Sequence, residues 1–344
     1  RKAKISYGGD TTLNIHNPAF QVDYALKADQ KITIESTGID MEVTLNAAMY
    51  EYKASASLEQ INLHNETGNL TVNKVKIQAS GEKINDYLWA GKGLSSVNQF
   101  SFNGPNDVTF SVENLTNDYE LDKESETNLT FHWQSTLKTL SAPDFALKDT
   151  QLDLRFNHLD IEAITDYVQS IRAMYEESEQ SPKTPLEVAT KTTEIASRVG
   201  EKILKNSPEL IIKNLSFTLN GGNFIGNSTT QFIGDSLQSL QELSNSKALN
   251  EKLVSSANIH FDKNLAIAIT TLGLKKQMAA GGMDIKSLPP EQLEQMVNVQ
   301  AGTFLQTFVN QGYLSHDNDQ YFTTFEMKDG KRLINGKDLP IPGM

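Results

Sequence analysis

Apolar and polar side chains alternate with a period of two through almost all of the first 158 residues. The alternation is clear in FQVDYALK and YEYKASASLE, and it returns in DVTFSVENL, NLTFHWQSTL and TQLDLRFNHL. Because successive side chains of a β-strand point to opposite faces, each stretch predicts a strand with one apolar face. Turn signals such as HNETGN and NGPND separate these stretches at the intervals of an antiparallel meander.

After residue 158 the period changes to that of a helix. The segment DIEAITDYVQSIRAMYEES places Ile161, Ile164, Val168, Ile171 and Tyr175 on one helical face, and Asp160 is the expected N-cap. Similar signals predict helices near 160–180, 185–206, 263–279 and 289–312, with strands between and after them. The predicted fold class is therefore α+β: a large, meander-rich antiparallel sheet with about four helices in the C-terminal half. Residues 1–158 are expected to be all-β, and 159–344 to be an α+β region that continues the sheet.

Composition excludes several classes of partner and chemistry. The net charge of −12 argues against nucleic acid and anionic lipid surfaces, which both require clustered Lys and Arg. The chain contains no cysteine, so it has no disulfides and no thiolate chemistry. No apolar run approaches the roughly 20 residues of a membrane span. Because the chain opens inside a strand pattern, we expect a further N-terminal segment to precede it in the full-length protein.

The residues that could carry chemistry do not form a recognisable site. The six histidines, His16, His64, His132, His158, His260 and His316, are scattered without metal-binding spacing, and His132 and His158 are expected to be structural. The stretches WAGKGLSS and NGGNFIGNS lack the spacing of a phosphate loop. Asp317 and Asp319 in HDNDQ lack the rest of a calcium loop and predict a solvated turn. The sequence thus predicts no enzyme activity, no cofactor and no catalytic, cofactor-binding or metal site.

The predicted helices are too few to cover the predicted strands. A strand occupies about 4.8 Å of a sheet and a packed helix about 10 Å, so four helices cover about eight strands. The N-terminal sheet must then close on itself into a core or leave an apolar trough, and we expect the closed core. In that case Phe110→Ala and Phe131→Ala should both be strongly destabilising. The residues that would line a trough, and contact a hydrophobic ligand there, are Tyr50, Tyr52, Phe100, Phe102, Phe110 and Phe131.

Three segments of the chain resemble the YdgA family of Gram-negative bacteria, which has no assigned activity. They are the opening ISYGGDTTLNIHNPAF, the central NSPELIIKNLSFTLNGGNFIGNST and the closing YFTTFEMKDGKRLINGKDLPI, in that order. The resemblance implies a protein held in the inner membrane by an N-terminal hydrophobic anchor, with its body in the periplasm. It implies no catalytic residues. This chain lacks the anchor, so its periplasmic location is inherited from the resemblance alone.

Two functions agree with these observations. The first is a non-enzymatic envelope protein with a structural or protein-interaction role, whose strand edges meet another envelope protein or a second copy of the chain. The alternative is a carrier of hydrophobic ligands such as lipids, bound in an apolar trough of the sheet. The first is favoured if the sheet closes on itself, and the second if it stays open.

Overall fold

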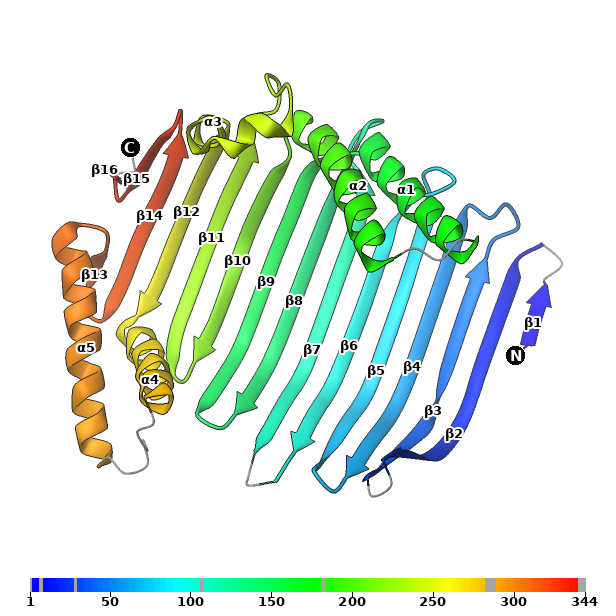
Figure 1. Ribbon diagram of the computed structural model, residues 1–344, viewed down its shortest axis with the longest axis horizontal. Coiled ribbons are helices and arrows are strands. Elements are labelled where there is room, and N and C mark those ends of the chain that lie inside the picture. Colours follow the sequence, from blue (N-terminus) through cyan, green and yellow to red (C-terminus); the bar gives the residue numbers. More distant parts are fainter. Residues whose placement is uncertain are drawn as a thin grey trace.

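A computed structural model describes residues 2–5, 9–27, 30–105, 108–180, 184–281 and 289–339. Sixteen strands form a single antiparallel sheet in which almost every strand pairs with its neighbours in the sequence (Figure 1). The first nine strands are β1 (Lys2–Ile5), β2 (Thr11–Lys27), β3 (Gln30–Leu45), β4 (Glu51–Asn65), β5 (Gly68–Lys83), β6 (Trp89–Asn103), β7 (Thr109–Lys123), β8 (Asn128–Ala142) and β9 (Phe145–Asp160). The others are β10 (Glu209–Leu219), β11 (Gly222–Phe232), β12 (Leu253–Asp262), β13 (Ser315–Asp317), β14 (Gln320–Lys328), β15 (Lys331–Ile334) and β16 (Lys337–Asp338). The predicted antiparallel meander is confirmed.

The long helices lie where their periodicity predicted them. They are α1 (Ile161–Gln180), α2 (Pro185–Lys205), α4 (Lys263–Ala280) and α5 (Pro290–Gln311). A capping box between Thr184 and Glu187 starts α2, and the left-handed Gly312 ends α5. The short 3₁₀ helix η1 (Leu240–Ser244) and α3 (Ser246–Glu251) were not predicted, because five or six residues are too few to show a period. In the described ranges, no helix has both the length and the hydropathy needed to cross a membrane.

The sheet does not close. Strands β1 and β16 lie at opposite edges of the strand order and do not pair with each other (Figure 1). Closure would require two edge strands of matching length to meet, whereas the described β1 has 4 residues and β16 has 2. The expected closed core is therefore wrong: the meander adds each strand to the same growing edge, and nothing returns the last strand to the first.

Three of the four long helices lie on one face of the sheet. Figure 1 shows α1, α2 and α4 in front of it, with α1 and α2 across the upper strand ends and α4 over the lower ends of β11 and β12. At the lower end, a Cβ on Gly222 of β11 would overlap the backbone of Leu265 in α4, so the helix approaches the sheet as closely as a glycine allows. At the upper end, Leu129 of β8 is completely buried.

The C-terminal turns form as the sequence predicts. Asp329 and Gly330 connect β14 to β15, and Asn335 and Gly336 connect β15 to β16. All four residues have positive φ, from 48° to 74°. Asn and Gly tolerate this left-handed conformation better than other residues, which explains their choice at the tight turns that end the sheet.

Candidate functional site

Strand register separates the sheet into an apolar face and a polar face. Residues directly opposite each other in an antiparallel pair share a face, so rows of partners can be followed across the strands. One row is Val43, Ala54, Ala79, Gly93, Tyr119, Trp133 and Leu154, and a second is Leu45, Tyr52, Gly81, Gly91, Leu121, Phe131 and Phe156. A third row, nearer the lower strand ends, is Ser36, Ile61, Val72, Phe100, Val112, Leu140 and Leu147. None of these residues is charged.

Within each strand, the residue of the first row and that of the third row are an odd number of positions apart, so strict alternation would place them on opposite faces. A line of residues with left-handed backbone restores them to the same face. Mid-strand residues with positive φ occur in alternate strands, at Gly38 (106°), Lys74 (51°), Asn114 (49°) and Asp149 (48°). Each lies where the apolar pattern slips by one residue, as between the two valines of β5 that flank the pair Asn73–Lys74.

At Asp149, the register of β9 on β10 also shifts by one residue. Because Gln151 pairs with Ser216 and Lys148 with Thr218, two residues of β9, Asp149 and Thr150, lie opposite the single Phe217. This is a β-bulge, in which one extra residue reverses the alternation of faces. Leu147 and Leu152 consequently share a face although they are five residues apart, since their partners on β10, Leu219 and Leu215, are four apart. The apolar face is thus continuous from the upper to the lower strand ends.

Much of this face remains uncovered. The surface–mass relation for folded monomers gives about 14,000 Å² for a chain of 38.2 kDa, whereas this chain exposes 21,564 Å². Exposed apolar side chains of the strands lie mostly on the apolar face, and they belong to the N-terminal part of the sheet, away from α4: Leu13, Phe20, Val22, Tyr24, Met41, Ile77 and Tyr119. Extended exposed apolar surfaces of this kind mark binding sites.

Five of the six residues expected to line a trough lie on the apolar face. Tyr52, Phe100, Phe102, Phe110 and Phe131 are all half-buried strand residues. The rings of Phe100 and Phe110 meet edge to face with their centroids 5.8 Å apart, and the ring of Tyr52 meets that of Trp89 at 5.3 Å. The sixth residue, Tyr50, lies in the turn before β4 and its side chain is exposed.

Sequence reasoning did not single out several exposed members of the face. Met41, Ile77 and Tyr119 are 40%, 48% and 41% exposed, and Phe20 and Val22 of β2 are also exposed. The alternation that predicted the strands contained all five residues. It could not show which strands the helices would leave uncovered.

The polar face carries a groove of about 720 Å³ across β3 to β8. Its lining includes Lys53, Gln78, Lys92, Asp118 and Glu120. Strand alternation places these side chains opposite the apolar rows, so no ligand reaches both surfaces at once. Lys92 pairs with Glu120 across β6 and β7. The charged side chains of β4 to β7 that line the groove therefore lie on the polar face.

His132, on the polar face, belongs to a hydrogen-bonded network rather than to a metal centre. Its Nε2 lies 2.8 Å from Asp153, which also accepts a hydrogen bond from Gln134 at 2.9 Å. Burial opposes ionisation of Asp153, but these two hydrogen bonds outweigh it and hold the pKa of the carboxyl below its usual value. Within the described ranges, no three His, Asp or Glu side chains gather closely enough to bind a metal. Asp317 ends β13, and Asp319 lies in the turn between β13 and β14.

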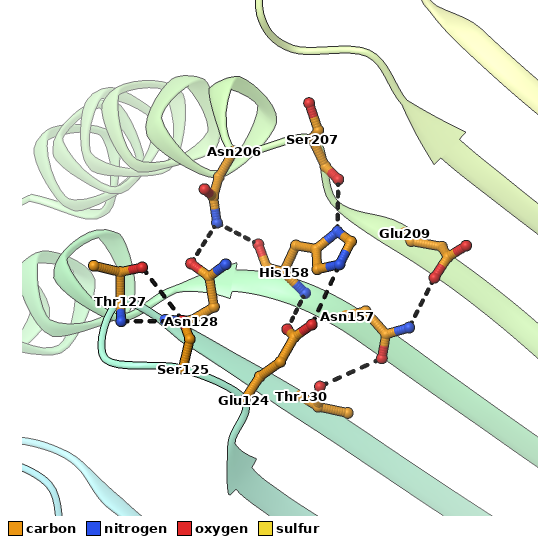
Figure 2. Close-up of polar contacts among 10 residues, drawn as sticks. All are labelled: Glu124, Ser125, Thr127, Asn128, Thr130, Asn157, His158, Asn206, Ser207 and Glu209. Carbon is orange, nitrogen blue, oxygen red and sulfur yellow. Dashed lines mark hydrogen bonds and ion pairs between the residues drawn. The ribbon is translucent and has the colours of Figure 1, made fainter.

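A polar cluster joins the base of the α1–α2 hairpin to the sheet (Figure 2). His158 has a left-handed backbone, with φ of 59°, and its Nδ1 and Nε2 lie 3.2 Å from the Ser207 carbonyl oxygen and 3.3 Å from Glu124. The Nδ2 of Asn206 donates to the His158 carbonyl at 2.7 Å and to Asn128 at 2.9 Å. His158 therefore has a structural role at the point where the chain enters α1 and leaves α2.

Comparison with known proteins identifies the family of the chain. No curated protein and no solved structure matches it. The model of a bacterial protein family of unknown function, DUF945, matches residues 2–342, which is nearly the whole chain. The chain therefore belongs to the DUF945 family of bacterial proteins of unknown function.

Proposed function

We propose that this protein binds hydrophobic ligands, and specifically that hydrocarbon chains such as those of lipids lie on the apolar face of β2 to β7. The observation that carries the proposal is the open sheet, whose large apolar side chains stay exposed where no helix covers them. Binding of hydrophobic ligands thereby moves ahead of the structural or protein-interaction role, which a closed core would have favoured.

Burial of hydrocarbon supplies the driving force. Each methylene removed from water contributes about 0.8 kcal/mol, so ten methylenes against the sheet give about 8 kcal/mol before the cost of association. The side chains of the face are aromatic, aliphatic or small, and the three rows described above contain no charge. Recognition would thus select the hydrocarbon, while a charged headgroup would remain in water at an edge of the sheet.

The cellular setting remains that implied by the resemblance to the YdgA family. In this proposal the protein works in the periplasm of a Gram-negative bacterium, anchored to the inner membrane by a segment outside this chain, and it is not an enzyme. A periplasmic carrier must shield hydrocarbon from water, and the exposed apolar face offers a surface against which the hydrocarbon can pack.

A pair of matched variants tests the proposal. Ile77 and Gln78 are neighbours in β5, both are exposed, and their side chains lie on the apolar and the polar face respectively. Binding of a pyrene-labelled fatty acid to purified protein should weaken by at least tenfold in Ile77→Asp and remain unchanged in Gln78→Asp, because only the first places a charge against hydrocarbon.

Native mass spectrometry of the protein purified from the periplasm gives an independent reading. Co-purified lipid is expected in the wild type and in Gln78→Asp, and less of it in Ile77→Asp. Absence of both probe binding and co-purified lipid from the wild type would overturn the carrier function. A tight assembly with another envelope protein would then return the interaction role to first place.

A further inference from the structure

The α1–α2 hairpin is inserted between two strands that are direct neighbours in the sheet. Strand β9 ends at Asp160, β10 begins at Glu209, and the pairing of Asn157 with Glu209 brings the two ends together. A two-residue turn would be enough to connect them. Instead the chain leaves the sheet, forms two helices of 20 and 21 residues, and returns to the same place.

The base of this insertion is firmly fixed. Two residues there, His158 and Ser207, have left-handed backbones, with φ of 59° and 53°. The amide of His158 donates to Glu124 at 2.9 Å, and the Asn206 side chain holds the His158 carbonyl (Figure 2). Left-handed backbone at non-glycine residues persists only where the surroundings determine it, so the cluster defines one pivot for both helices.

The two helices hold each other more extensively than they hold the sheet. Ala163 of α1 packs against Ile195 and Val199 of α2, with Ile171 and Ile203 at the margin. The carboxylate of Asp166 in α1 accepts hydrogen bonds from Arg198 at 2.9 Å and from Lys202 at 3.3 Å. The α1–α2 hairpin therefore has its own apolar interior and is stabilised mainly by contacts between its two helices.

Contacts between the hairpin and the strands are few away from the pivot. Among the strands, β9 approaches the backbones of both helices most extensively. One side-chain tether also reaches the turn between β5 and β6, where Asn85 donates to Thr165 at 2.9 Å. Tyr167 and Tyr175 of α1 are 42% and 64% exposed, so the apolar surface of α1 is incompletely buried. A ligand chain could complete this interface.

We infer that the α1–α2 hairpin is a movable cover of the apolar face. It pivots at the cluster around His158, lifts from the upper strand ends to admit a hydrocarbon chain, and closes on it with the apolar side of α1. This inference rests on the proposed function. A hairpin with one fixed base, its own interior and a single described side-chain tether to a distant strand connection has the construction of a lid.

Cross-linking tests whether the cover must move. Because the chain contains no cysteine, only the introduced cysteines react with the linker. Asn85→Cys with Thr165→Cys, bridged by a short dithiol-reactive linker, fixes the hairpin to the sheet. Ser111→Cys with Ser141→Cys, whose hydroxyl oxygens lie 2.7 Å apart, joins two neighbouring strands and serves as the control. Release of the pyrene-labelled fatty acid into excess vesicles should slow at least tenfold in the first cross-linked protein and not in the second.

A complementary variant removes the tether without cross-linking. Thr165→Val keeps the shape of the side chain and deletes the hydroxyl that accepts from Asn85, so release of the probe should become faster. If the wild type does not bind the probe, the proposed function fails. If it binds the probe, but release is the same in the cross-linked, control and Thr165→Val proteins, the cover inference is wrong and the proposed function stands.

Discussion

The ring of Tyr119 on β7 lies over Gly93 on β6, in the place that a Cβ at position 93 would occupy. The two residues are direct partners in the antiparallel register. Gly93 is buried beneath a tyrosine that is itself 41% exposed on the apolar face. An aromatic side chain thus fills the gap that glycine leaves in the surface of the sheet.

This relationship predicts coupling between the two positions. Gly93→Ala should cost about 1–3 kcal/mol in free energy of unfolding, because the ring must leave its place. The same change made in a Tyr119→Ala background should cost much less. Urea unfolding of the four proteins of the double-mutant cycle measures the coupling. Additive costs would show that the ring does not constrain position 93.

The line of left-handed residues predicts an unusual preference at Lys74. Its φ of 51° is costly for a β-branched residue and free for glycine. Lys74→Val should therefore destabilise the protein by about 1–2 kcal/mol, while Lys74→Gly should be neutral or stabilising. Lys76, two residues along the same strand and also exposed, provides the control, since valine should be preferred to glycine there. The same order of preference at both positions would contradict the left-handed backbone at Lys74.

The open sheet changes the expected cost of truncating its aromatic side chains. Phe110 and Phe131 are half-buried, whereas Leu129 is completely buried. Leu129→Ala should cost about 2–5 kcal/mol, and Phe110→Ala and Phe131→Ala only about 1–2 kcal/mol each, because little buried surface is lost. Thermal or urea unfolding decides the order. A cost of about 3–5 kcal/mol for both phenylalanines would indicate a packed core around them.

Acid should loosen the α1–α2 hairpin through Asp166. Burial opposes ionisation of this carboxyl, but hydrogen bonds from Lys202, Arg198 and Ser170 outweigh it and hold its pKa below the usual 3.8. A depressed folded-state pKa contributes stability above 3.8 that is lost as the pH falls through the folded-state value. Asp166→Asn should therefore be less stable than wild type at neutral pH.

The pH dependence of the difference in stability between wild type and Asp166→Asn tests whether Asp166 acts through its charge. The gap in unfolding free energy between wild type and Asp166→Asn should narrow as the pH drops below 3.8, since protonation removes the same charge from the wild type. Glu162→Gln is the control, because the Glu162 side chain is 86% exposed and its ion pair with Lys202 should contribute little. A gap that stays constant in acid would exclude an electrostatic role for Asp166.

The amino-acid pattern alone determined the elements and their order. A period of two marks a strand whatever its neighbours are, and a period of 3.6 marks a helix, so the long strands and the four long helices could be located by residue number. Short connections between successive strands also favoured the meander, because sequential strands usually pair. Five of the six residues proposed to contact a ligand lie on the apolar face because alternation fixes which side chains share a face within a strand.

Only the tertiary structure decided whether that face is covered. The pattern is the same for a sheet that closes and for one that stays open, since both require one apolar side. The choice depends on whether the edge strands meet and where the helices dock, which are long-range relations that no local period contains. The continuity of the face also depends on β-bulges such as that of Asp149 and Thr150 opposite Phe217, and a slip in phase becomes a bulge only when a partner strand sets the register.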